Sequence, residues 1–137
     1  MRTSLRPRVL ADFEGTWQLN REIVQANDTR AVFNGTAVWC TCTEGLVYHE
    51  IGELKMPQAL PMQAERRYVW WPDLEVHFED GRFFHKVPAN GGEATHWCGP
   101  DTYKASYDFT DWPRFTVVWK VSGPKKSYLM KSRYQRG

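Results

Sequence analysis

Charged and imidazole side chains alternate with large aromatic side chains at several places in this 137-residue chain. Glu50 stands two residues after Tyr48, and His85 stands two residues after Phe83. Alternate residues of a β-strand point to the same side, so a face that buries the aromatic ring also buries the polar group. Buried ionisable groups need partners and often mark functional sites. These spacings therefore indicate polar chemistry inside an aromatic core.

The histidines are the most versatile members of this polar set, because imidazole can donate, accept or shuttle a proton near neutral pH. We expect His85 and His96 to contact a ligand, and Glu50 and Asp101 to orient the two imidazoles. Tyrosine hydroxyls would fix a polar group of the ligand, and Phe83 and Tyr107 would add to the walls. The candidate ligand-binding residues are Tyr48, Glu50, His85, His96, Asp101, Tyr103, Trp119 and Tyr128.

The elements that must position these residues are strands, because apolar and polar residues alternate with period two through most of the chain. Turn residues separate the runs, and Asp80-Gly81 between two alternating runs is the clearest hairpin. The expected strands are Phe13–Gln25, Ala31–Cys42, Leu46–Lys55, Glu65–Trp71, Leu74–Glu79, Arg82–Val87, Ala94–Cys98, Thr102–Phe109, Phe115–Val121 and Ser127–Gln135. The pattern predicts an all-β protein: one closed antiparallel up-and-down barrel of about eight to ten strands, forming a single domain over residues 1–137.

Two interpretations compete with small-molecule binding in the barrel. A histidine and a carboxylate in the cavity could form the acid–base pair of an isomerase or hydrolase, although no nucleophile motif accompanies them. Alternatively, the polar groups satisfy one another in a solid core. We favour binding because small barrels are commonly hollow. The sequence leaves open whether there is catalysis and which ligand is bound.

A further interpretation is that His85, His96 and Cys98 bind a metal, because histidine and cysteine side chains are ligands of zinc and copper. No Cys-x-x-Cys or His-Glu-x-x-His spacing accompanies them. We therefore predict no resident metal and no cofactor. By strand parity, His49 and His77 are expected on the solvent side.

Charge and cysteine content narrow the partners and the compartment. The net charge of +2 is small for a nucleic-acid binder, although Arg114 to Gly137 holds seven basic and no acidic residues. No run approaches the ~20 apolar residues of a membrane span, and no apolar segment follows the basic start. Cys40 and Cys42 are awkwardly spaced for a mutual disulfide. We expect a cytoplasmic protein that binds a small molecule, with no nucleic-acid or membrane partner; a homodimer stays open.

The stretch Phe13-Glu14-Gly15-Thr16-Trp17 resembles the first strand of lipocalin-like (calycin) barrels. The resemblance implies that Trp17 plugs one barrel end and that an arginine of the last strand, Arg133 or Arg136, lies over its ring. It covers only this strand and the terminal arginine. Some calycin barrels bind haem through one histidine, so occupation of the His85, His96 and Cys98 region by haem or a metal also stays open.

Nearly the full chain resembles an uncharacterised family of small, mostly bacterial calycin-like proteins. The resemblance implies a single barrel and no established activity. It rests on Phe13-x-Gly15-x-Trp17 with Arg21, Phe33-x-Gly35, Tyr48-x-Glu50-x-Gly52, Arg67-Tyr68-x-Trp70, Asp80 to His85, His96-x-Cys98-x-x-Asp101-x-Tyr103, Trp119-x-Val121-x-Gly123-Pro124-Lys125-Lys126-x-Tyr128 and Arg133-Tyr134.

Overall fold

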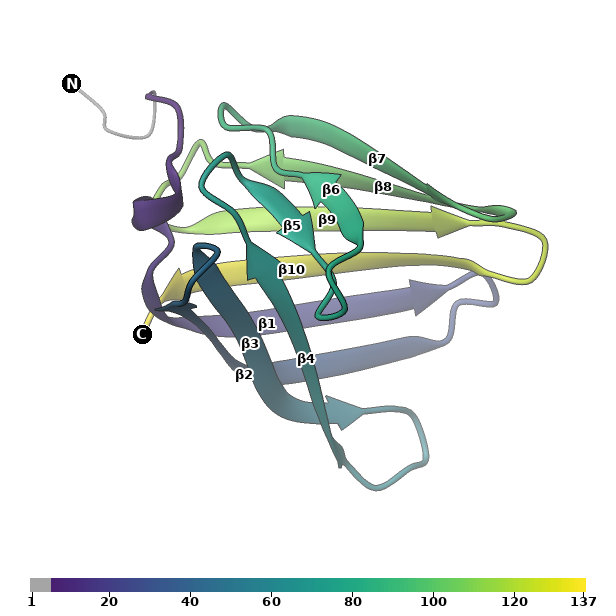
Figure 1. The fold of residues 1–137 in the computed structure, drawn as a ribbon. Coiled ribbons are helices and arrows are strands. Elements are labelled where there is room, and N and C mark those ends of the chain that lie inside the picture. The colour runs from purple at the N-terminus through teal and green to yellow at the C-terminus, as the bar shows by residue number, and fades with distance from the viewer. Residues whose placement is uncertain (1–5) are drawn as a thin grey trace.

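Ten strands and one short 3-10 helix form the part of the chain that the computed structural model describes, residues 6–137 (Figure 1). Each expected strand is present, with ends shifted by a few residues at most places and both ends matched in β3. The elements are η2 (Leu10–Asp12), β1 (Gly15–Gln25), β2 (Arg30–Thr41), β3 (Leu46–Lys55), β4 (Met62–Trp70), β5 (Glu75–His77), β6 (Phe83–Lys86), β7 (Gly92–Cys98), β8 (Asp101–Asp108), β9 (Phe115–Ser122) and β10 (Ser127–Arg136).

The strands form one antiparallel sheet in the order β6-β5-β4-β3-β2-β1-β10-β9-β8-β7. Neighbouring strands in this order are also neighbours along the chain, except where β1 pairs with β10. The sheet curls into a nearly closed barrel, as the sequence predicts (Figure 1). Within residues 6–137, no ladder joins the two end strands β6 and β7, which lie next to each other. We call this interruption the seam.

The first residues of β1 close one end of the barrel. Trp17 is fully buried, and its indole N–H donates to the backbone oxygen of Phe13 at 2.8 Å. The guanidinium of Arg136 lies over the indole at 4.1 Å from the ring centroid, which confirms the expected arginine and assigns it to Arg136. Arg133 instead meets Glu22 on the outer surface at 2.8 Å. A Cβ on Gly15 would lie 2.8 Å from Arg136 Nη1, so the glycine leaves room for this cap.

Aromatic rings fill the barrel behind this cap. Phe13 contacts the rings of Trp39, Trp70 and Phe115 with centroid separations of 5.1–5.7 Å. Burying each such side chain stabilises the fold by roughly 2–3 kcal/mol. This end of the barrel is therefore a solid apolar core, and open space begins beyond it.

A close approach of β2 and β3 shapes the other part of the barrel. Gly35 pairs with Gly52, and a Cβ on Gly35 would lie 2.2 Å from the backbone oxygen of Ile51. A Cβ on Gly52 would meet the oxygen of Asn34 at 2.3 Å. Only glycine fits at this crossing, and β3 bends sharply before it ends while it stays paired with β2 (Figure 1).

The β5–β6 hairpin carries an irregularity that changes which side chains face inward. Val76 pairs with His85 and His77 pairs with Phe83, which leaves Phe84 as an extra residue. Such a bulge breaks strand alternation. Phe84 and His85 consequently both line the interior. Phe83, expected to share the inward face of His85, also lines the cavity but is 50% exposed. The Asp80-Gly81 turn forms as expected, with Gly81 at φ 94° and its N–H bonded to Phe78 O at 2.9 Å.

Candidate functional site

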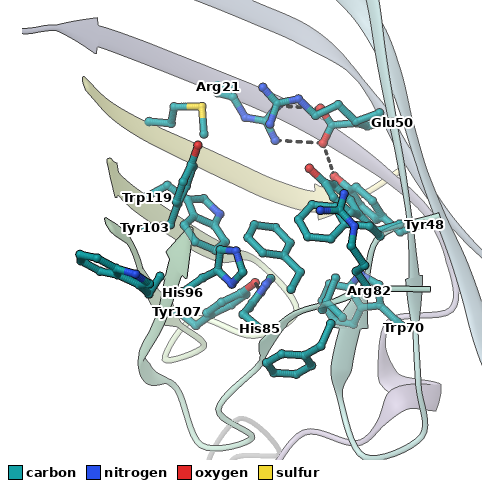
Figure 2. Close-up of a pocket in the computed structure, with 18 of the residues that line it drawn as sticks. Arg21, Tyr48, Glu50, Trp70, Arg82, His85, His96, Tyr103, Tyr107 and Trp119 are labelled. Atoms are coloured by element: carbon teal, nitrogen blue, oxygen red, sulfur yellow. Dashed lines mark hydrogen bonds and ion pairs between the residues drawn. The ribbon is translucent and has the colours of Figure 1, made fainter. Parts of the chain in front are cut away.

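A cavity of about 750 Å³ occupies the barrel beyond the aromatic core (Figure 2). Its size lies within the ~300–1,000 Å³ typical of small-molecule sites. The residues around it come from both sides of the seam, from β3 to β6 and from β7 to β10, together with Arg21 of β1. Seven of the eight sequence-predicted binding residues line it: Tyr48, Glu50, His85, His96, Tyr103, Trp119 and Tyr128.

A buried ion pair forms one wall of the cavity. Arg21 holds both carboxylate oxygens of Glu50, with Nη1–Oε2 and Nη2–Oε1 distances of 2.6 and 3.0 Å. Arg21 Nε also donates to Ser132 Oγ at 2.7 Å. Burial alone would raise the pKa of Glu50, but the hydrogen bonds and charge of Arg21 outweigh it and lower that pKa below its ordinary value. Glu50 is thus a fixed, ionised carboxylate.

Two tyrosines extend this network. Tyr48 donates its hydroxyl proton to Glu50 Oε1 at 2.5 Å, because an ionised carboxylate can only accept. The Tyr134 hydroxyl, 2.8 Å from the Tyr48 oxygen, is therefore the donor in their bond. Burial raises the pKa of Tyr48 well above its ordinary value and that of Tyr134 to about 12, so both stay protonated. The polar groups of this wall satisfy one another.

His85 lies across the cavity from this wall, beside Tyr107 (Figure 2). Its Nε2 is 2.8 Å from the Tyr107 hydroxyl. Burial, with a smaller contribution from the nearby His96, lowers the pKa of His85 to about 3, so the imidazole is neutral at physiological pH. Its buried Nδ1 has no hydrogen-bond partner in the described part of the chain. His85 can therefore offer one further polar contact.

Stacked rings line the space between these two sides. Phe84 lies parallel to Trp119, with centroids 5.2 Å apart and planes 9° apart. Tyr68 packs on Phe84 at 5.6 Å, and His96 meets the Phe84 ring edge to face at 5.1 Å. His96 also contacts Tyr103 at 6.0 Å. These flat faces give the cavity an aromatic wall.

Asp101 does not line the cavity, contrary to the prediction. It is the first residue of β8, and its carboxylate lies 3.7 Å from Lys126 Nζ. A Cβ on Gly123 would be 2.0 Å from Asp101 Oδ1, so the carboxylate packs against the β9–β10 turn. Parity correctly groups Asp101 with Tyr103 but does not show that the cavity ends before the strand does.

The predicted pairing of Glu50 and Asp101 with His85 and His96 is also absent from the structure. Glu50 bonds to Arg21 and Tyr48, and Asp101 meets Lys126. The hydrogen-bond partner of His85 is Tyr107. Without a carboxylate partner and with its pKa near 3, His85 is poorly suited to act as a general base near neutral pH.

The two histidines expected outside differ in their surroundings. His49 lies on the outer face of β3, where its Nε2 meets Glu65 at 2.6 Å. His77 also points outward but is only 9% exposed, because Trp71 stacks on it at 4.5 Å. Its ring nitrogens contact Gly81 O at 3.1 Å and Glu75 Oε1 at 3.0 Å. The expectation of a solvent-exposed His77 is therefore wrong.

In the described residues, no group of three or more His, Cys, Asp or Glu side chains is placed to bind a metal ion. His85 and His96 approach the same aromatic wall but hold no carboxylate between them. The side chain of Cys98 lies outside the described part of the structure. Cys40 and Cys42 are free thiols.

Arginines are the main members of the site that the sequence reasoning missed. Arg21, Arg66 and Arg82 all line the cavity. Arg21 shares the strand parity of the buried Trp17 and Leu19, which was a usable signal. Arg66 pairs directly across from Glu50, which parity could also have shown once the β3–β4 register was known.

Comparison with known proteins places the chain in a family. A family model matches residues 13–136, nearly the whole chain. The protein belongs to DUF6314, a family of unknown function. This agrees with the resemblance to an uncharacterised calycin-like family. A search of curated proteins finds no match.

The fold of this DUF6314 member is similar to that of the S-type phycobiliprotein lyase CPES from Guillardia theta. The two structures superpose with a TM-score of 0.63, over 93% of this chain and 90% of the lyase chain. They share 9% sequence identity, so the similarity is one of fold. None of the helices in residues 6–137 has the length and apolar character needed to span a bilayer.

Proposed function

We propose that this protein binds a small molecule inside its barrel. The observation that carries the proposal is the cavity of about 750 Å³, with stacked rings on its wall and the unsatisfied Nδ1 of His85 beside it. An apolar surface with a few placed polar groups is the usual composition of a ligand site. We infer that His85 and His96 contact the ligand, and that Tyr103, Trp119 and Tyr128 complete its surroundings.

Binding suits the geometry better than catalysis. The fold neighbour is named as a lyase, so a barrel of this kind is compatible with an enzyme. In this chain, however, the neutral His85 bonds to a tyrosine, and Glu50 is fully engaged by Arg21 and Tyr48. These groups position and hold a molecule more readily than they transfer protons.

The test begins with native mass spectrometry of freshly purified protein, which detects a bound metabolite, haem or metal together with the oligomeric state. Binding of the neutral fluorophore 1-pyrenemethanol is then compared between two variants. His96→Trp narrows the cavity and should weaken binding by about tenfold or more, since a bulkier side chain fills ligand space. His49→Trp, on the outer face of β3, is the matched control and should bind as the native protein does.

Equal binding by His96→Trp and His49→Trp would contradict the proposal, provided that both variants retain the native circular dichroism spectrum. His85→Ala and His96→Ala are expected to release whatever co-purifies with the native protein. Retention of that molecule by both variants would remove the histidines from the site.

We also infer that the protein resides in the cytoplasm, a reducing compartment. Cys40 is exposed and Cys42 partly so, and both are unbridged. Free exposed thiols fit the cytoplasm, and labelling of both by a thiol reagent in lysates made under alkylating conditions would test this location.

A further inference from the structure

We propose that the ligand is a flat aromatic anion whose charged group is held by Arg66 and Arg82 at the cavity opening. The inference rests on the proposed function and names the class of molecule for the same site.

The charges around the cavity are unbalanced. Among residues 6–137, the lining holds three guanidinium groups, those of Arg21, Arg66 and Arg82, and one carboxylate, that of Glu50. Glu50 is committed to Arg21 through two hydrogen bonds. His85 is neutral. Arg66 therefore faces the cavity without an ion-pair partner in the described residues, and the partner of Arg82, at 2.8 Å, is Asp80, which lies outside the lining.

The remaining guanidinium groups have donors to spare. Within residues 6–137, Arg66 takes part in no ion pair or hydrogen bond, although its charge contributes to lowering the pKa of Glu50. The guanidinium of Arg82 lies over the Phe78 ring at 4.9 Å and donates one N–H, that of Nε, to Asp80 Oδ2 at 2.8 Å. A guanidinium carries five N–H donors in a fork that matches carboxylate and phosphate oxygens. These two residues can consequently receive an anion.

Both arginines stand where the cavity meets solvent. Their side chains are exposed, as are those of Phe83 and Trp97, which also line the cavity at 50% and 68% exposure. The polar groups deeper in the cavity, on the Glu50 wall, already satisfy one another, and the Nδ1 of His85 is the one buried nitrogen of the described lining that stays without a partner. A ligand that fits this division has an apolar body inside and an anionic end at the opening.

The apolar body should be flat. Phe84, Trp119 and Tyr68 form one stack, and Tyr103 and Tyr128 add further rings to the lining. Aromatic faces pack best against other planar rings. A sugar would instead need many free hydrogen-bonding groups in the interior, and a cation would be repelled by the arginines.

The test uses three probes of nearly the same shape: 1-pyrenecarboxylate, 1-pyrenemethanol and 1-pyrenemethylammonium. Their dissociation constants are measured by fluorescence at low and high salt. We expect the carboxylate to bind about tenfold or more tightly than the alcohol, the size expected for a charge-assisted hydrogen bond. Salt should reduce this preference, and the ammonium should bind most weakly.

Neighbouring arginines of β4 provide the matched variants. Arg66 lines the cavity, whereas Arg67 lies on the other side of the strand, 3.8 Å from Glu65. Arg66→Gln and Arg82→Gln should each reduce the preference for the carboxylate while leaving affinity for the alcohol nearly unchanged. Arg67→Gln removes the same charge from the outer face and should keep the preference.

The possible results distinguish a failure of the anionic ligand class from a failure of small-molecule binding in the cavity. Equal binding of all three probes, or tightest binding of the ammonium, would overturn the anionic class and leave cavity binding intact. A preference that survives in the Arg66→Gln/Arg82→Gln double variant would overturn the assignment to these residues. Failure of every probe to bind, with no co-purified molecule in the native mass spectrum, would count against both this inference and the proposed function.

Discussion

Phe84 lies flat on Trp119, with ring centroids 5.2 Å apart and an interplanar angle of 9°. The contact joins strands from opposite sides of the seam, since Phe84 belongs to β6 and Trp119 to β9. It places a side chain from the β5–β6 hairpin inside the cavity. The hairpin therefore determines how much of the aromatic wall a ligand can reach.

Removing this ring should expose the indole that it covers. We predict that Phe84→Ala shifts the tryptophan emission maximum to longer wavelength, because water reaches Trp119. Phe83→Ala is the control, since Phe83 is already half exposed and does not stack on Trp119. The measurement is steady-state fluorescence of the folded variants. Identical spectra for the two variants would show that Phe84 does not shield Trp119 in solution.

The stability of the barrel end around Trp17 should depend far more on the burial of the indole than on the cation–π contact with Arg136. Trp17→Ala is expected to lower the free energy of unfolding by about 3–5 kcal/mol, as for other large buried aromatic residues. Arg136→Gln loses the contact above the indole and should cost about 0.5–2 kcal/mol. Arg133→Gln, on the outer surface, should change stability by less than about 1 kcal/mol. Urea denaturation measures all three, and an equal loss for both arginine variants would contradict the assignment of the cap to Arg136.

Replacing only one member of the Arg21–Glu50 ion pair should lower the stability of the protein more than replacing both. Glu50→Gln leaves the buried Arg21 without its counter-charge and should destabilise the protein by about 3–5 kcal/mol. The double variant Arg21→Met/Glu50→Leu should lose less, because no unpaired charge remains. Glu53→Gln, on the exposed side of β3, is the control. Equal losses for the single and double variants in urea denaturation would contradict a charge-based explanation.

This carboxylate also adds to stability in a definite pH range. The pKa of Glu50 is lowered in the folded state. Its contribution is therefore present above the unfolded value of about 4.5 and is lost as the pH falls through the folded value.

Because His85 is neutral in the folded protein, it should lower the free energy of unfolding as the pH falls. This loss should begin at a higher pH than the loss caused by Glu50. The folded pKa of His85 is about 3, against an ordinary value of 6.5. Below about pH 6.5 the unfolded chain binds a proton that the folded chain excludes, so this group lowers stability by up to about 1.4 kcal/mol per pH unit until the folded pKa is reached. His85→Gln should flatten the fall between pH 6.5 and 4.5, whereas His49→Gln should retain it. Parallel curves for the native protein and His85→Gln would refute this role.

Much of the fold follows from the sequence because barrel strands obey a short-range rule. Alternation placed Tyr48, Glu50 and Trp119 on inward faces, and the structure puts all of them on the cavity. Turn residues located the hairpin ends, and the Gly15-x-Trp17 pattern located the buried plug. These features depend on neighbours within a few residues, which a sequence displays directly.

The errors arise where distant parts of the chain decide the outcome. Phe84 turns inward because a bulge adds one residue to β6, and alternation cannot count that residue. His77 points outward as parity requires, yet Trp71 covers it. Asp101 lies on the expected face but meets Lys126 at the end of the strand. The partner of Glu50 proved to be Arg21, from another strand, and not a histidine.

The strand order has a consequence for how the chain folds. In the part of the chain that the structure describes, every ladder but one joins strands that follow each other along the chain, so most of the sheet can grow as successive hairpins. The exception is β1 with β10, whose partners Arg21 and Ser132 are 111 residues apart. Closing so long a loop has an entropic cost that local contacts do not offset, and non-local pairing slows folding. Refolding should therefore wait on the meeting of β1 and β10, and mutations in that ladder should slow folding more than mutations in the hairpins beside the seam.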